Sequence, residues 1–140
     1  MPAPARARTS PPIPLTELLD ASGAQVIGAI DPETEFRWIE RNSRDVTPSD
    51  LFIAVKGEVH DGHAFVADAA AHGASAALVR ADWAAQHADM SIPLIAVPDP
   101  VEALQQLAAA RRAKLDIGVV GVTGSLGKTS TKETIAAVLG

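Results

Sequence analysis

The feature that most restricts how this chain can fold is a glycine-rich turn between a buried strand and a helix. The apolar run 117–122 predicts the strand, residues 130–139 predict the helix, and Gly-x-x-Gly-Lys-Thr occupies 124–129 between them. Glycines let backbone N–H groups approach an anion, and a helix N-terminus adds partial positive charge. A strand, this turn and a helix in succession therefore predict a loop that binds nucleotide phosphates.

The side chains of this loop have expected roles. Lys128 can reach the β- and γ-phosphates, and the Thr129 hydroxyl can ligate Mg²⁺. Both are predicted catalytic residues, Thr129 is the predicted metal ligand, and ATP and Mg²⁺ are the expected cofactors. Val122 stands where G-x-x-x-x-G-K-[ST] has its first glycine, which disfavours a generic P-loop kinase. The residues predicted to bind the nucleotide are Thr123, Gly124, Ser125, Leu126, Gly127, Lys128, Thr129 and Ser130.

Upstream of the loop, strand patterns alternate with helix patterns, which predicts an α/β fold. Thr16 is the expected N-cap of the first helix, which Gly23 ends. Asp61 and Gly73 are the expected cap and stop of a helix over 62–72. The predicted strands are 26–30, 36–39, 51–55, 76–79 and 94–97, and the further predicted helices are 82–87 and 100–114.

Composition narrows the class of protein. The 140 residues are 47% hydrophobic and 21% charged, which is enough apolar material for a buried core. The absence of cysteine excludes a disulfide framework and thiolate-bound metal centres. A net charge of −5 without a basic stripe argues against binding of duplex nucleic acid, and no apolar run approaches the roughly 18 residues that span a bilayer. We therefore expect a cytoplasmic protein with no membrane insertion; its oligomeric state stays open.

Shifts in composition divide the chain into four parts. Residues 1–14 hold five of the ten prolines and are expected to be a disordered tail. Residues 15–98 should form a small mixed α/β domain, and 99–116 a connecting helix. Residues 117–140 should be the first strand, phosphate loop and helix of a truncated parallel-sheet ATP-binding domain. Because one strand and one helix cannot bury both faces of a parallel sheet, we expect an N-terminal part of a longer enzyme.

Two motifs resemble the Mur ligase family, the ATP-dependent amide-bond-forming enzymes of peptidoglycan precursor synthesis. The phosphate loop with Ser125 and the following Ser-Thr-Lys-Glu, 130–133, is similar to that of the D-alanyl-D-alanine-adding member. The block 42–57, continued by Asp-Gly-His-Ala-Phe, resembles D-S-R…P-G-D-L-F-x-A-x-x-G of the family's first domain. Asn42 replaces the usual Asp of that block, and Ser49 replaces the usual Gly, which should alter only a turn.

The resemblance implies the substrates UDP-N-acetylmuramoyl-tripeptide and D-alanyl-D-alanine, joined through an acyl phosphate. In the family, the first domain holds the UDP end of the nucleotide sugar. The resemblance therefore places five residues of this chain beside the UDP group. A serine hydroxyl suits ribose or uracil, and an arginine fork suits a diphosphate. The predicted substrate-binding residues are Ser43, Arg44, Lys56, Gly57 and His63.

Simpler alternatives stay open at this stage. Arg44 can pair with Asp45 or Asp50 at the surface, the serine can shape a turn, the lysine can end a strand in solvent, and the histidine can be structural. For the whole protein, the alternatives are a Mur ligase that adds a single amino acid and a non-catalytic UDP-sugar-binding module.

We expect the 140-residue chain by itself to catalyse no ATP-dependent ligation. A second acidic Mg²⁺ ligand and the base-binding residues have to come from further strands, because only about ten residues follow Ser130. The measurement is ADP release from Mg-ATP with UDP-N-acetylmuramoyl-tripeptide and D-alanyl-D-alanine. Release above a no-enzyme control would overturn this expectation.

Overall fold

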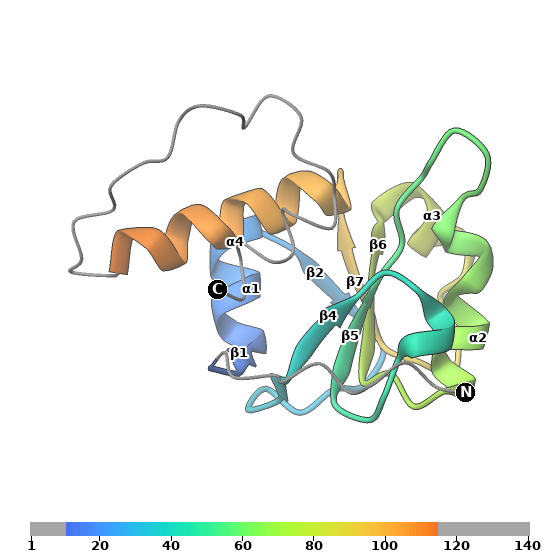
Figure 1. Cartoon of the computed structure of the whole chain (residues 1–140), viewed down its shortest axis with the longest axis horizontal. Coiled ribbons are helices and arrows are strands. Elements are labelled where there is room, and N and C mark those ends of the chain that lie inside the picture. The colour runs from blue at the N-terminus through green and yellow to red at the C-terminus, as the bar shows by residue number, and fades with distance from the viewer. Residues whose placement is uncertain (1–10, 115–140) are drawn as a thin grey trace.

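Residues 11–114 are described by the computed structural model, and they form three layers, with helices on both faces of a central sheet (Figure 1). The sheet has five strands in the order β2-β7-β6-β5-β4. Strands β4 to β7 run parallel, and β2 pairs antiparallel with β7 at one edge. This arrangement confirms the predicted mixed α/β fold. The strands are β2 Gln25–Ile27, β4 Trp38–Glu40, β5 Asp50–Ile53, β6 Ala76–Arg80 and β7 Leu94–Val97.

Helices α1 and α4 lie on one face of the sheet, and α2 and α3 lie on the other (Figure 1). Within residues 11–114, no helix combines the length and apolar character needed to cross a bilayer. A short antiparallel pair joins β1 (Ile13–Pro14) to β3 (Glu35–Phe36). The helical elements are α1 Leu15–Ser22, α2 Val66–Ala71, α3 Ala81–Gln86 and α4 Pro100–Lys114, with 3₁₀ turns η1 Ser43–Asp45 and η2 Gly62–Phe65.

Strand β5, which lies between β6 and β4, is apolar on both faces. Leu51 and Ile53 belong to the core beside α1 and α4, whereas Phe52 and the next residue, Ala54, belong to the core beside α2 and α3. All four side chains are fully buried. A parallel strand between two layers of helices is expected to show such a continuous apolar run. Burial of each of the large side chains contributes about 1.5–3 kcal/mol, so the strand stabilises the packing of both helical layers on the sheet.

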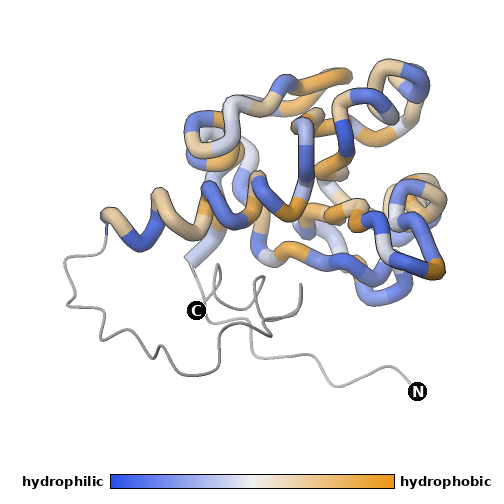
Figure 2. The backbone as a smooth tube through the Cα atoms, turned by 90° about the horizontal axis from the view of Figure 1, so that it is seen from above, coloured by the Kyte–Doolittle hydropathy of each residue, from blue (hydrophilic) through white to orange (hydrophobic). Residues whose placement is uncertain are grey.

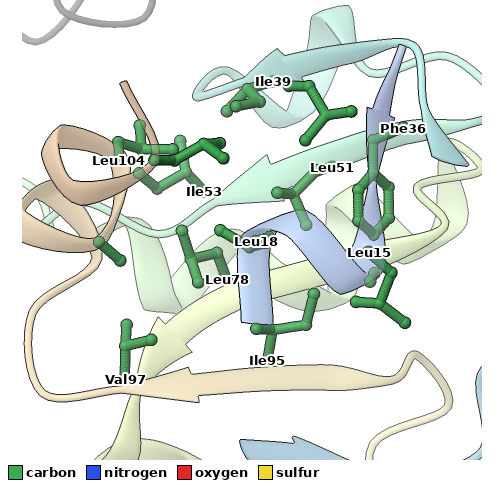
Figure 3. Close-up of a cluster of buried hydrophobic side chains, with 14 residues drawn as sticks. Leu15, Leu18, Phe36, Ile39, Leu51, Ile53, Leu78, Ile95, Val97 and Leu104 are labelled. Carbon is green, nitrogen blue, oxygen red and sulfur yellow. The ribbon is translucent and has the colours of Figure 1, made fainter. Parts of the chain in front are cut away.

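Figure 3 shows the larger core, between the sheet and the pair α1 and α4. Leu18 of α1 and Leu104 of α4 meet the side chains of Ile53 and Leu78, which project from neighbouring strands. Both helices are therefore needed to cover this face. The buried members of this core are Ile13, Leu15, Leu18, Phe36, Ile39, Leu51, Ile53, Ala76, Leu78, Ile95, Val97, Ala103, Leu104 and Leu107.

Helix α4, which was expected to be a connecting helix, also covers one face of the sheet together with α1. Leu104 and Leu107 are fully buried, and Figure 2 shows hydrophilic positions recurring between apolar ones along the helix. Near its end, Arg111 Nε lies 3.0 Å from Glu17 Oε1 of α1, and both side chains are mostly buried. The helix predicted over 100–114 is confirmed. The domain boundary placed just before it stays a prediction, although the helix packs against the domain that it follows.

The start of the fold differs from the expectation. Ile13 is fully buried and pairs with Phe36, so the prediction of a disordered tail through residue 14 is wrong for β1. Helix α1 begins at Leu15, whose N–H donates to the Thr34 carbonyl at 2.8 Å. Thr16 lies inside the helix, so its prediction as the N-cap is wrong. Pairing of β1 with β3, and not a side-chain cap, fixes where the helix begins.

Three other predicted elements have different limits in the structure. The strand over 36–39 is divided into β3 and β4, because its two halves pair with different strands, β1 and β5. The helix over 62–72 begins as η2 and continues as α2. Its cap Asp61 and its stop Gly73, which has a φ of 99°, are confirmed. The strand over 26–30 is the shorter β2.

The turn before β5 holds a serine in the left-handed region. Ser49 has a φ of 74°, and it is the non-glycine residue with a positive φ among residues 11–114. The Asp50 N–H donates to the Thr47 carbonyl at 3.1 Å, so Pro48 and Ser49 are the two central residues of a β-turn. Proline followed by a positive φ is typical of a type II turn, which favours glycine at the second central position. The departure from the family pattern at Ser49 is therefore a source of backbone strain.

We expect Ser49→Gly to stabilise the chain by about 0.5–1 kcal/mol. Relief of the left-handed conformation gains about 1–2 kcal/mol, and the greater freedom of glycine in the unfolded chain offsets about 0.5–1 kcal/mol of it. Urea unfolding followed by circular dichroism measures the difference. Ser75→Gly is the matched control, because Ser75 has no positive φ, and it should lose stability. Equal effects of the two substitutions would contradict the assignment of strain to Ser49.

Candidate functional site

The parallel strands bring separate parts of the sequence to one edge of the sheet. Because β4 to β7 are parallel, their carboxyl ends lie together. The chain leaves β4 toward η1, β5 toward Lys56, β6 at Arg80 and β7 toward Pro98. Ligands of open parallel sheets bind outside the carboxyl ends of the strands. This edge is therefore the candidate site within residues 11–114.

An open cleft with a volume of about 410 Å³ lies at this edge. Two cationic side chains, Lys56 and Arg80, line it together with the N-terminal end of α4. Asp99 caps that helix, its Oδ1 accepting the Val101 N–H at 3.0 Å. The Arg80 guanidinium also pairs with Asp82 at 2.9 Å, and Asp99 is an anionic residue of the lining. Two cationic side chains beside a helix N-terminus favour an anionic ligand. The lining residues are Ala54, Val55, Lys56, Arg80, Pro98, Asp99, Pro100 and Val101.

A loop over 56–61, which we call the edge loop, stands beside the cleft. Its base is closed by an antiparallel bridge between Lys56 and Asp61. Inside it, the Gly57 N–H donates to the His60 carbonyl at 2.8 Å. Val59 is 84% exposed, although it is apolar. The edge loop is thus held at its base and presents its tip to solvent.

The motif Asp-Gly-His ties the edge loop to the sheet. Asp61 Oδ1 accepts the His63 backbone N–H at 3.0 Å and lies 2.6 Å from His63 Nδ1. The His63 Nε2 accepts the Arg80 backbone N–H at 3.0 Å, at the end of β6. The backbone N–H of His63, followed by its ring, holds the pKa of the Asp61 carboxyl below its usual value. One buried imidazole therefore links the edge loop to a neighbouring strand.

Gly62, the middle residue of this motif, lies against the backbone of Ala54 and Val55, the two residues that follow β5. Its N–H donates to the Val55 carbonyl at 2.8 Å. A Cβ at this position would stand 2.6 Å from the Val55 nitrogen and 3.1 Å from the Ala54 Cα. Backbone atoms cannot rotate away as a side chain would. Glycine is therefore required here by close approach.

The first predicted substrate residues lie at the end of β4. Asn42 Oδ1 accepts the Arg44 N–H at 3.1 Å and caps η1, so an amide oxygen fills a capping role at the position where the family has Asp. The Ser43 side chain is buried, and its hydroxyl donates to Asp68 Oδ2 of α2 at 2.7 Å. Arg44 is exposed, and its guanidinium forms no ion pair within 4 Å with any of residues 11–114. The serine therefore anchors η1, while the arginine faces solvent.

Glu40 adds a titratable group at the same end of β4. Burial raises the pKa of its carboxyl above the usual value, and the nearby Asp45 and Asp50 add to this effect. The Asn42 and Arg41 N–H groups, each 3.1 Å from Glu40 Oε1, oppose it by stabilising the charged form. The carboxylate thus closes the turn that leads into η1.

The structure brings the five predicted substrate residues to one edge, in different roles. Ser43 and His63 are buried and make structural hydrogen bonds, whereas Arg44 and Gly57 are exposed and Lys56 lines the cleft. Sequence reasoning missed Arg80 and Asp68. Arg80 stands at the end of a buried strand beside other strand ends, which is the signal that could have identified it. Asp68 gave no such signal, because its contact with Ser43 spans 25 residues.

The phosphate loop, including Lys128 and Thr129, lies outside the described residues, as do the other residues predicted to bind the nucleotide. Within residues 11–114, no group of three or more His, Cys, Asp or Glu side chains could hold a metal ion. The residues predicted to bind ATP and Mg²⁺ are therefore known from the sequence alone.

The fold and the cleft define a class of protein, namely three-layer α/β proteins with a ligand site at the carboxyl edge of a parallel sheet. A sequence profile described as "Mur ligase family, catalytic domain" matches residues 35–112, which is more than half of the chain. The chain belongs to the Mur ligase family.

Individual relatives agree with this assignment. The UDP-N-acetylmuramoyl-tripeptide–D-alanyl-D-alanine ligase of Bacillus subtilis is 42% identical over 115 residues, which cover 77% of this chain and 23% of that protein. The UDP-N-acetylmuramoyl-L-alanyl-D-glutamate–2,6-diaminopimelate ligase of Pseudomonas aeruginosa is 39% identical over 105 residues, 74% of this chain and 22% of that protein. A crystal structure of MurF from Acinetobacter baumannii superposes with a TM-score of 0.65 at 34% identity and covers 74% of this chain and 22% of that one. The chain thus spans about a quarter of the length of such relatives.

We expect Gly62→Ala to destabilise the chain by about 1–3 kcal/mol. The added methyl group would meet backbone atoms of Ala54 and Val55, and the contact is relieved only if these residues shift. Thermal and urea unfolding measure the loss. Ala64→Ser, an exposed position in the same 3₁₀ turn, is the control and should stay within about 0.5 kcal/mol of the parent. An unchanged stability of Gly62→Ala would contradict the close approach.

Proposed function

We propose that this chain supplies the nucleotide-sugar-binding part and the phosphate loop of a ligase that joins D-alanyl-D-alanine to UDP-N-acetylmuramoyl-tripeptide. The observation that carries the proposal is the carboxyl edge of the sheet, where Lys56 and Arg80 line an open cleft and Arg44 is exposed at the end of β4. These cations suit the diphosphate of a nucleotide sugar. The identity to relatives that bear this ligase name supports the choice of substrate.

In the proposed reaction, the terminal carboxylate of the tripeptide attacks the γ-phosphorus of ATP, which forms an acyl phosphate and releases ADP. The amine of D-alanyl-D-alanine then attacks the acyl carbon, an amide forms, and phosphate leaves. Binding at the carboxyl edge would hold the nucleotide end of the substrate and so present its peptide end to the phosphate loop. Positioning of this kind converts a bimolecular encounter into a step within one complex.

The donor set of the phosphate loop fits Mg-ATP. Gly124 and Gly127 leave backbone N–H groups open to phosphate oxygens, Lys128 would hold the β- and γ-phosphates, and the Thr129 hydroxyl would ligate Mg²⁺. A bound Mg²⁺ supplies neutralisation of the charge on the phosphates. Lys128 would stabilise the negative charge that develops during transfer of the phosphoryl group. Cytoplasmic location belongs to the same proposal, since these substrates are water-soluble.

A second candidate is a Mur ligase that adds a single amino acid. The identity of 39% to the diaminopimelate ligase of Pseudomonas aeruginosa favours it. Ser125 and the following Lys132-Glu133 favour the D-alanyl-D-alanine-adding member instead. An assay of the full-length protein with each tripeptide or dipeptide precursor and each amine would decide between the two.

The experiment is calorimetric titration of the chain with UDP-N-acetylmuramoyl-tripeptide and, separately, with Mg-ATP. We expect binding of the nucleotide sugar, weakened about tenfold or more by Lys56→Gln or Arg80→Gln, because each removes a charged hydrogen-bond donor from the cleft. Binding of Mg-ATP in addition would favour the ligase over a non-catalytic UDP-sugar-binding module.

The matched control is Arg112→Gln, which makes the same change of charge on an exposed residue in the last turn of α4. The helix begins at the cleft and is 15 residues long, so Arg112 lies roughly 18 Å along the axis from it. An equal loss of affinity in this variant would mean that net charge alone governs binding. Absence of binding to the parent chain would contradict the proposed site.

A further inference from the structure

His63 is placed so that its protonation state is fixed by its two hydrogen-bond partners. A backbone N–H can only donate, so the Arg80 N–H, 3.0 Å away, requires a lone pair on Nε2. The Asp61 carboxylate can only accept when ionised, so Nδ1, 2.6 Å from it, carries the proton. The ring in this structure is therefore the neutral Nδ1–H tautomer. Its side chain is only 3% exposed, so water cannot replace either partner while the ring stays in place.

The two partners belong to different parts of the candidate site. Asp61 closes the base of the edge loop by its bridge to Lys56, and Arg80 ends β6 and lines the cleft. The imidazole also packs against Trp83 of α3, with ring centroids 5.3 Å apart. One neutral ring therefore holds the edge loop, the end of β6 and α3 in a single arrangement.

We propose that His63 is a positioning residue that holds the edge loop against the end of β6 only while its ring is neutral. A proton taken from solvent at Nε2 turns an acceptor into a donor that faces the Arg80 N–H. The hydrogen bond between these two nitrogens is then lost, and the ring has to leave its place. Acid thus releases the edge loop. The link to ligand binding rests on the proposed function, because the edge loop carries Lys56 and Gly57.

The surroundings determine where an added proton goes. Asp61 and the Arg80 backbone contact His63 directly. The charged or titratable groups one contact further are Lys56, which acts on Asp61; Asp82, which contacts Arg80; and His87, which stacks on Trp83. The lowered pKa of Asp61 keeps this carboxylate ionised between about pH 5 and pH 8. Asp82 pairs with the Arg80 guanidinium at 2.9 Å, and Trp83 contacts both imidazole rings, with centroid distances of 5.3 Å to His63 and 3.9 Å to His87. Among these groups, His63 is the one at which an added proton would point at a backbone N–H, that of Arg80.

Nitrogen-15 NMR of the whole 140-residue chain tests the tautomer directly. At about pH 8 we expect protonated Nδ1 and unprotonated Nε2 on His63. On acidification to about pH 5, the Arg80 and Gly57 amide signals should shift together with the His63 ring signals. The protection of the Arg80 amide against hydrogen exchange, taken relative to the intrinsic exchange rate at each pH, should fall about tenfold or more. A proton on Nε2 at about pH 8, or an Arg80 amide whose signal and protection do not change on acidification, would overturn the proposal.

Two substitutions separate positioning from simple structural support. The amide oxygen of His63→Gln can reach the Nε2 position and accept the Arg80 N–H without titrating, so the protection of the Arg80 amide should stay high at both pH values. His63→Asn can serve Asp61 but falls short of Arg80, so the protection of the Arg80 amide should be low at both pH values. His72→Asn, which changes an exposed histidine directly after α2, is the matched control and should behave like the parent. A parent-like pH response in His63→Gln would overturn the proposal even if His63→Asn fails to fold.

Titration of the chain with UDP-N-acetylmuramoyl-tripeptide at about pH 8 and about pH 5.5 then tests the consequence. We expect the affinity of the parent to fall at least fivefold at the lower pH and that of His63→Gln to change less than twofold. Equal falls in both would overturn the role of His63 in positioning the site. Absence of binding at either pH, together with the expected NMR result, would contradict the proposed function and leave the acid release of the loop intact.

Discussion

The rest of this structure depends on one constraint, namely that both faces of its parallel sheet have to be covered. Strands β5 to β7 carry buried apolar side chains on both sides, so neither face can meet water. Helices α2 and α3 cover one face because they connect successive parallel strands. The other face is covered by α1 and α4, which come from opposite ends of the described chain and are joined by the ion pair of Arg111 with Glu17.

Parallel strands also decide where chemistry can occur. Their carboxyl ends have to lie on one edge, and the polar groups that follow each strand meet there. Most of these groups serve the edge itself. Ser43 anchors η1 to α2, Asn42 caps it, and His63 joins the edge loop to β6. The charged residues that line the cleft beside them are Lys56, Arg80 and Asp99, so the site combines a rigid frame with two cationic side chains and one carboxylate.

Much of the fold could be predicted from the sequence, because long apolar runs and clear stop signals carry it. The strands over 51–55, 76–79 and 94–97 and the helix over 100–114 are present with small changes at their ends. The start of α1 could not be predicted, since the pairing of β1 with β3 sets it and a threonine nearby gave a misleading cap signal. Within the candidate site, Lys56 was predicted from the sequence but Arg80 was missed, and the roles of Ser43 and His63 stayed open. Burial and partners distant in the chain decide whether a serine or histidine faces a ligand or the interior.

The sequence by itself determined the alternation of strands and helices, the glycine-rich loop over 124–129 and the likeness to the Mur ligase family, because these depend on residue type and local spacing. The tertiary structure alone decided that Ser43 bonds to Asp68, that Arg80 joins Lys56 at the cleft and that Ser49 is strained. Contacts between segments far apart in the chain leave no periodic trace in the sequence. Only packing of the layers against the sheet selects which of them form.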